Sequence, residues 1–221
     1  MYVIIVGAGD IGSQLIDLAV TAGYEVVVVE KDDAVASQIA SEYDCLVING
    51  DATVQETLVD AGAADADAII ATTESDAANV MVMLLAEELD VPSKVSVVQN
   101  PDHMDLFRRI GVNVLENPQR LISEYLFRAV QRPSVKDFMT LAGDAEVFEI
   151  TVTDDAPVAG MTLSDADEAG VIPDDVRVVA VERNHEVLPA HGDTTVEPGD
   201  LVTVFSMAGA TQDVSAVFAG D

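Results

Sequence analysis

Short apolar runs alternate with longer segments of helical periodicity over the first 131 residues. The runs are rich in β-branched residues, which is typical of parallel strands buried on both faces of a sheet. Strands are predicted at residues 2–6, 25–30, 45–48, 68–72, 94–98 and 112–116. Helices are predicted between and after them, at residues 11–22, 34–43, 54–61, 77–89, 101–110 and 118–131. Six strands joined by crossover helices predict an α/β fold with a doubly wound parallel sheet.

The alternation changes after residue 131, because Pro133 ends the last helical segment. Residues 132–145 include "TLAGDAE" and are predicted to form a linker. The remainder, 146–221, contains strand patterns at 147–152, 176–183, 185–189 and 201–206, with helices near "MTLSDA" and at 210–218. We therefore predict a first domain over 1–131 and a small α+β subdomain over 146–221, which is expected to lean on a neighbour or a second copy.

Acidic residues dominate the charge of the chain, with 40 acidic against 10 basic residues and a formal net charge of −30. Because 49% of the residues are hydrophobic, the chain is predicted to fold. An acidic surface repels phosphate backbones, so no nucleic-acid partner is expected. We interpret the acid excess as halophile-like, an adaptation to a salty cytoplasm, with divalent-cation sites as the alternative.

One cysteine, Cys45, cannot form a disulfide within the chain, which fits a reducing cytosol. No apolar stretch reaches the length of a membrane span, and no signal peptide is recognised. A cytoplasmic location is therefore expected.

Glycines in "GAGDIG" follow the first predicted strand with G-x-G-x-x-G spacing, at Gly7, Gly9 and Gly12. A strand that turns into a helix through such a loop directs backbone N–H groups at a phosphate, while the last glycine lets the helix pack close to the strand. Glu30 ends the second strand, where a carboxylate accepts hydrogen bonds from ribose hydroxyls and repels a 2′-phosphate. The pattern predicts a Rossmann-like nucleotide site; a tight turn with a surface acid is the alternative.

Polar loops also follow the third and fourth strands, "NGDAT" at 49–53 and "TTESDAANV" at 72–80. Both lie at the carboxyl edge of the predicted sheet, where ligands bind in this fold class. Thr53 and Ser75 are also suited to cap the helices that follow. Ligand contact and capping are both left open here.

The sequence contains no recognisable set of catalytic residues. The chain has three histidines, His103, His185 and His191, far apart in sequence and outside any recognisable catalytic or metal-binding pattern. We therefore expect no enzyme activity and no metal centre. A small NAD-dependent oxidoreductase is the alternative.

The chain resembles the RCK (KTN) domains that regulate potassium uptake, the TrkA family. The resemblance rests on "VIIVGAGDIG", "VVVVEKD", "VINGDAT", "LVDAGAADADAIIATTESDAANV" and "NPDHMDLFRRIGVNVLENP" in the first half. In the second half it rests on "VAGMTLSD" and "VVAVERNHEVLPAHGDTTVEPGDLVTVF". It implies a cytoplasmic regulatory subunit that binds NAD(H) or ATP/ADP and docks on a membrane-embedded Trk- or Ktr-type potassium translocating subunit. A potassium channel or a cation antiporter is the alternative partner.

The resemblance also implies which residues hold the ligand. The phosphate loop matches Gly7, Ala8, Gly9, Asp10, Ile11 and Gly12, and the ribose acid with the residue after it matches Glu30 and Lys31. The segment flanking the adenine matches Asp51, Ala52 and Thr53. The loop and helix start near the phosphates or the second half of the ligand match Thr73, Asp76 and Asn79. The sequence departs from the family at Val97, where many members have Arg or Lys facing the phosphates, and this leaves the choice of nucleotide open.

An apolar stripe marks the helix predicted at 118–131, with Leu121, Ile122, Tyr125, Leu126 and Ala129 on one face. Packing on its own sheet is one interpretation. The resemblance favours the other, a dimer helix in a homo-oligomeric ring, an octamer or a tetramer.

Overall fold

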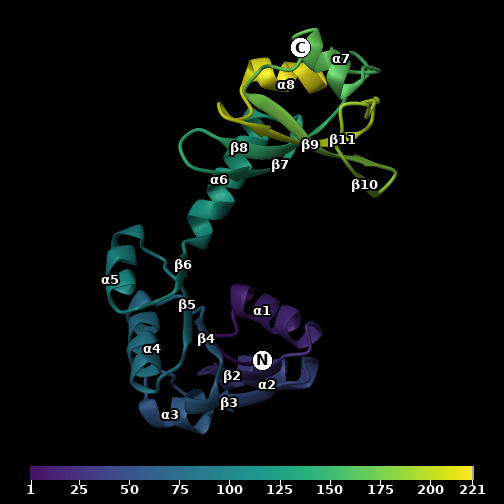
Figure 1. Cartoon of the computed structure of the whole chain (residues 1–221). Helices are drawn as coiled ribbons and strands as arrows, with labels where there is room; N and C mark the ends of the chain where they lie inside the picture. The colour runs from purple at the N-terminus through teal and green to yellow at the C-terminus, as the bar shows by residue number, and fades with distance from the viewer. Residues whose placement is uncertain (221) are drawn as a thin grey trace. The chain divides into compact units, whose positions relative to one another are not determined.

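The computed structural model describes residues 1–220, with the backbone alone at residues 114–116. The chain forms two compact units, drawn in Figure 1. The first runs from Met1 to Ser123 and the second begins at Glu124, so the boundary lies within helix α6 (Pro118–Gln131). Among the described residues, none of the helices combines the length and apolarity needed to cross a membrane.

The first unit is built on a parallel sheet with the strand order β3-β2-β1-β4-β5-β6. The strands are β1 (Tyr2–Val6), β2 (Glu25–Glu30), β3 (Leu46–Asn49), β4 (Ala68–Ala71), β5 (Ser93–Val97) and β6 (Val114–Glu116). The order reverses between β1 and β4. This doubly wound topology confirms the fold class predicted from the sequence.

Helices follow each strand of this unit: α1 (Asp10–Thr21), α2 (Asp33–Glu42), α3 (Gln55–Asp60), α4 (Asp76–Glu88) and α5 (Met104–Arg109), with short 3₁₀ helices η1 (Ala63–Asp65) and η2 (Pro101–His103). Side chains of β1 alternate between two cores. Ile4 and Val6 pack with α3, α4 and α5 residues, whereas Val3 and Ile5 pack with α1 and α2 residues. The unbroken apolar run of β1 is explained by this burial on both faces.

An antiparallel sheet with the order β10-β9-β11-β8-β7 forms the second unit. Its strands are β7 (Val135–Thr140), β8 (Glu146–Thr151), β9 (Val176–Arg183), β10 (Glu186–Pro189) and β11 (Leu201–Ser206), and its helices are α7 (Leu163–Glu168) and α8 (Gln212–Ala219). Alternate residues of β8 and β11 are buried, and Figure 1 shows α7 and α8 on the same side of the sheet. Phe148, Ile150, Val204 and Phe218 form the centre of this core.

The predicted linker needs a correction, because residues 132–145 contain β7. This strand pairs antiparallel with β8, from Val135 opposite Ile150 to Thr140 opposite Glu146, with a bulge near Val135. It is an edge strand with mostly exposed side chains, so its sequence lacks the apolar run that identified the other strands.

The apolar stripe on α6 is exposed. Leu121, Ile122, Tyr125 and Leu126 keep 48–60% of their surface accessible. The interpretation that this stripe packs on the chain's own sheet is therefore wrong.

Candidate functional site

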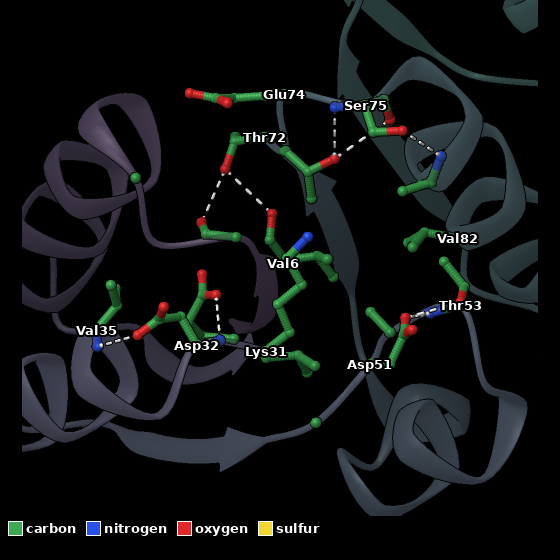
Figure 2. Close-up of a pocket in the computed structure, with 18 residues that line it drawn as sticks. Val6, Lys31, Asp32, Val35, Asp51, Thr53, Thr72, Glu74, Ser75 and Val82 are labelled. Carbon is green, nitrogen blue, oxygen red and sulfur yellow. Dashed lines mark hydrogen bonds between the residues drawn. The ribbon is translucent and has the colours of Figure 1, made fainter.

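A cleft of about 730 Å³ opens at the carboxyl ends of β1, β2 and β4, next to the point where the strand order reverses (Figure 2). In doubly wound sheets this is the place where ligands bind, because the loops diverge there. The cleft is lined by Val6, Gly7, Gly9, Val29, Glu30, Lys31, Asp32, Val35, Gly50, Asp51, Ala52, Thr53, Thr72, Thr73, Glu74, Ser75, Ala78 and Val82.

The loop between β1 and α1 forms the floor of the cleft. Gly7 has φ +88°, a conformation that side chains rarely adopt. A Cβ atom on Gly12 would collide with the carbonyl oxygen of Gly7, so only glycine lets α1 approach the loop this closely. Gly9 precedes α1 and supplies no side-chain cap. The first N–H groups of α1 have no acceptor within the helix, and they carry its positive end.

Glu30 lies beside this loop and is held from two directions. Its Oε2 accepts the N–H of Ala8 at 2.8 Å, and its Oε1 accepts the N–H of Asp32 at 2.8 Å. The residue is only 9% exposed. Each carboxylate oxygen has a second lone pair, so the fixed carboxylate keeps capacity to accept hydroxyl groups from a ligand.

Asp51 and Thr53 form the opposite wall, after β3. Asp51 Oδ1 accepts the Thr53 hydroxyl at 2.7 Å and the Thr53 N–H at 2.9 Å. The hydroxyl hydrogen bond is the main reason that the pKa of Asp51 is lowered, and Lys31 adds a smaller attraction. Thr53 does not cap α3, because Val54 is the N-cap residue and makes no side-chain capping bond. The capping role considered for Thr53 is therefore wrong: its hydroxyl closes a turn instead.

The loop after β4 forms the third wall. Thr72 Oγ1 donates to the carbonyl oxygens of Val6 and Gly7, at 3.1 and 2.9 Å, and so joins this loop to the glycine loop. Thr73 Oγ1 lies 2.6 Å from Oδ1 of the fully buried Asn79. Ser75 caps α4 by accepting the N–H of Ala78 at 3.3 Å, which confirms the capping expected there. Ser75 also lines the cleft.

Asp76 lies behind that wall. Its carboxylate accepts the N–H groups of Gln99 and Asn100, at 2.7 and 3.0 Å, and lies 2.7 Å from Nδ1 of His103. Burial raises the pKa of Asp76, but these hydrogen bonds outweigh burial and lower it. Asp76 thus joins α4 to the end of β5.

Eight of the sequence-predicted site residues line the cleft: Gly7, Gly9, Glu30, Lys31, Asp51, Ala52, Thr53 and Thr73. The other six lie outside the lining: Ala8, Asp10, Ile11, Gly12, Asp76 and Asn79. Among these six, the N–H of Ala8 orients Glu30, Gly12 sets the approach of α1, and Asn79 supports the β4 loop.

Residues 3–118 match the TrkA-N domain, and residues 147–219 match the TrkA-C domain. The chain belongs to the TrkA family. It is 31% identical over 221 residues to a Trk system potassium uptake protein TrkA homolog of Methanothermobacter thermautotrophicus, with all of both chains covered.

Other members of the TrkA family differ in length. A homolog from Pyrococcus abyssi is 29% identical, with 98% of this chain and 97% of that one covered. A homolog from Archaeoglobus fulgidus is 27% identical over 99% of this chain, which spans 50% of that protein.

Solved structures show the same fold. The GsuK channel bound to NAD superposes with a TM-score of 0.69 and 21% identity, over 98% of this chain and 39% of that one. GsuK bound to ADP matches 57% of this chain and 33% of that one, with a TM-score of 0.53 and 27% identity.

Several cleft residues of this TrkA-family chain were missed from the sequence. Thr72 was not singled out as a site residue, Ser75 was expected only as a possible cap, and Asp32, which caps α2 while it lines the cleft, was not considered. The signal that could have found them was their place in the loops that follow β2 and β4. Val97, the departure in β5, is 8% exposed and is not one of the lining residues.

The two buried carboxylates of the second unit, Asp200 and Glu146, are paired with arginines. Arg183 donates from Nε and Nη2 to the two carboxylate oxygens of Asp200, both at 2.8 Å. Glu146 accepts Arg128 and Arg132, at 2.8 and 2.6 Å, and the N–H of Ala210. Burial raises the pKa of Asp200 and of Glu146, but these bonds outweigh it and lower both.

Proposed function

We propose that this chain is the nucleotide-sensing regulatory subunit of a membrane potassium uptake system. The observation that carries the proposal is the cleft, where the glycine loop, the free N–H groups of α1 and the fixed carboxylate of Glu30 converge. NAD(H) or ATP/ADP are the proposed ligands. Two solved structures with this fold, GsuK bound to NAD and GsuK bound to ADP, support this choice.

The site residues have distinct parts in this proposal. The diphosphate lies on the glycine loop, where the positive end of α1 favours negative charge. Glu30 accepts the ribose hydroxyls with its remaining lone pairs. Asp51, Ala52 and Thr53 flank the adenine, and Thr73 faces the second half of the ligand.

Regulation follows from differential binding. A ligand shifts a conformational equilibrium only as far as it binds one conformation better, and a tenfold preference corresponds to about 1.4 kcal/mol per site. Exchange of one nucleotide for another in this cleft is the proposed signal. No chemical step is part of the proposal.

The exposed face of α6 is the proposed contact with a second copy of the chain, leading to a homo-oligomeric ring of four or eight subunits. Its apolar residues remain exposed in the single chain, and such a patch marks an interaction surface. The ring is proposed to dock on a membrane-embedded Trk- or Ktr-type translocating subunit at the cytoplasmic face. The names of the TrkA homologs support a potassium uptake partner.

Calorimetric titration tests the ligand. Purified protein in potassium chloride is titrated with NAD⁺, NADH, ATP and ADP, alongside Gly9→Asp. No atom lies within 4 Å of a Cβ at Gly9, and Asp is a favourable N-cap residue, so the variant is expected to fold while its carboxylate repels the phosphates. Ser41→Asp, at an exposed position of α2, adds the same charge at a residue that does not line the cleft and serves as the matched control.

Binding that is retained by Ser41→Asp and lost by Gly9→Asp supports the proposal. Absence of binding to folded wild-type protein overturns it. A substrate-dependent change of NADH absorbance would favour the oxidoreductase instead. Co-purification with a potassium translocating subunit, rather than with a channel or an antiporter, tests the partner.

A further inference from the structure

The charge of the cleft lining is unusual for a site that receives phosphates. Four of the lining residues are acids, Glu30, Asp32, Asp51 and Glu74, against one basic residue, Lys31. Three of the acids are held by the fold. Glu30 is fixed by backbone N–H groups, Asp32 caps α2, and Asp51 closes a turn with Thr53.

Glu74 differs from the other three acids. It is exposed, and within the described part of the chain no hydrogen bond or ion pair is found for its side chain. Figure 2 shows its carboxylate at the rim of the cleft, directed to the side of the purple helix α1. This charge lines the cleft, and no hydrogen bond or ion pair within the described residues compensates it.

The β4 loop holds Glu74 close to the phosphate loop. The preceding residue, Thr73, has its backbone N only 3.3 Å from the position of a Cβ on Gly7. Thr72 is hydrogen-bonded to the carbonyl oxygen of Gly7 at 2.9 Å. Glu74 therefore lies at the end of the cleft where phosphates would extend beyond the glycine loop.

The basic residues near the cleft belong to other strands than β4. Lys31, the one basic lining residue, directly follows β2. Lys94 in β5 is buried and pairs with Glu87 of α4. Among the described lining residues, no basic side chain accompanies Glu74 on the β4 side.

We propose that Glu74 selects against a terminal phosphate, so that this site prefers an NAD-type dinucleotide to ATP. The proposal rests on nucleotide binding in the cleft. A dinucleotide places an uncharged or cationic nucleoside beyond its diphosphate, whereas ATP places a further charged phosphate there. Repulsion by an uncompensated carboxylate raises the free energy of the ATP complex and leaves the dinucleotide complex almost unchanged.

The experiment measures Kd for NAD⁺, ADP and ATP at constant ionic strength on wild type, Glu74→Gln and Glu88→Gln. Glu88 is an exposed acid on α4 outside the cleft, so its substitution is the matched control for charge. We expect Glu74→Gln to tighten ATP binding about tenfold and NAD⁺ binding less than about twofold, with no change for Glu88→Gln. Added salt is expected to weaken the discrimination by the wild type.

The experiment distinguishes failure of nucleotide binding from failure of the selection by Glu74. If folded wild type binds none of the three nucleotides, nucleotide binding itself fails, and the role of Glu74 with it. If all three bind and Glu74→Gln changes their affinities equally or not at all, only the selection by Glu74 is overturned. An equal effect of Glu88→Gln would likewise show that overall charge, not Glu74, sets the preference.

Discussion

Two carboxylates of the first unit, Glu30 and Asp76, are each held by a pair of backbone N–H groups, whereas the buried Glu146 and Asp200 of the second unit are held by arginines in addition to one backbone N–H each. Glu30 and Asp76 each accept two backbone N–H groups, and Glu30 faces an open cleft. Glu146 and Asp200 accept arginine side chains of their own unit. Backbone donors orient a carboxylate without cancelling its charge, so the first unit keeps groups that can respond to a ligand. In the second unit the two buried carboxylates are instead neutralised by arginines of the same unit.

The largest expected effect on stability comes from a substitution in the closely packed glycine loop. Gly12→Ala places a Cβ against the backbone of Gly7, which cannot move without displacing the loop or α1. We expect the free energy of unfolding to fall by about 3 kcal/mol or more. Chemical denaturation measures it, and hydrogen exchange resolved by peptide is expected to locate the loss in the first unit.

Gly9→Ala is the matched control for this substitution. A Cβ at Gly9 has no neighbour within 4 Å, so the same added methyl group is expected to cost less than about 1 kcal/mol. Equal losses for the two variants would mean that the approach of α1 to the loop is not what makes Gly12 necessary.

The next largest loss of stability is expected when the ion pair of Arg183 and Asp200 is broken. Asp200→Asn keeps the shape but turns an amide NH₂ toward groups that donate, the Arg183 guanidinium and the Glu197 N–H. Because Asp200 is 2% exposed, we expect a loss of about 2–3 kcal/mol in the second unit. Nucleotide affinity is expected to stay unchanged. Asp193→Asn, on an exposed loop of the same unit, should leave stability unaltered; a comparable loss there would contradict the role of the pair.

The parallel sheet and its glycine loop were predictable because local sequence determines them. Strands buried on both faces require apolar runs, and the turn into α1 requires glycine at Gly7 and Gly12. The ends of β1 and β2 coincide with the predicted ranges. Glu30 was predictable as a candidate from its place at the end of a strand.

Other features depend on partners far apart in the chain. Edge strand β7 is stabilised by pairing with β8, not by an apolar pattern of its own. Glu146 lies 18 residues from Arg128 and 14 from Arg132 in sequence, and the pairing of β7 with β8 returns the chain so that these side chains meet. The link from Thr72 to Gly7 spans 65 residues and has no periodic signature. The position of the cleft was therefore predictable from the sequence, whereas the long-range hydrogen bonds that shape it were not.

Acid is expected to weaken the second unit through its paired carboxylates. The folded-state pKa values of Glu146 and Asp200 are lowered, so the unfolded chain binds protons first as the pH falls. Their contribution is complete above the unfolded pKa, near 4, and is lost as the pH falls through the folded pKa. Each contributes a slope of at most about 1.4 kcal/mol per pH unit. Asp200→Asn is expected to show a shallower loss than wild type; equal slopes would refute the assignment.

The smallest expected effect compares two helix caps, one in each unit. Ser75 accepts the N–H of Ala78 at the start of α4, and Thr162 accepts the N–H of Asp165 at the start of α7. Ser75→Ala and Thr162→Ala are each expected to lower the free energy of unfolding by about 1 kcal/mol, since each leaves one first-turn N–H without its acceptor.

Only Ser75 lines the cleft, so the two variants separate stability from ligand binding. We expect Ser75→Ala to weaken nucleotide binding about threefold by loosening the start of α4, and Thr162→Ala to leave it unchanged. Calorimetry on both variants, at equal stability loss, measures this difference. Equal affinities would show that the β4 loop keeps its geometry through Thr72 and Asn79 alone, and the ligand-facing wall would then be more rigid than its capping bond suggests.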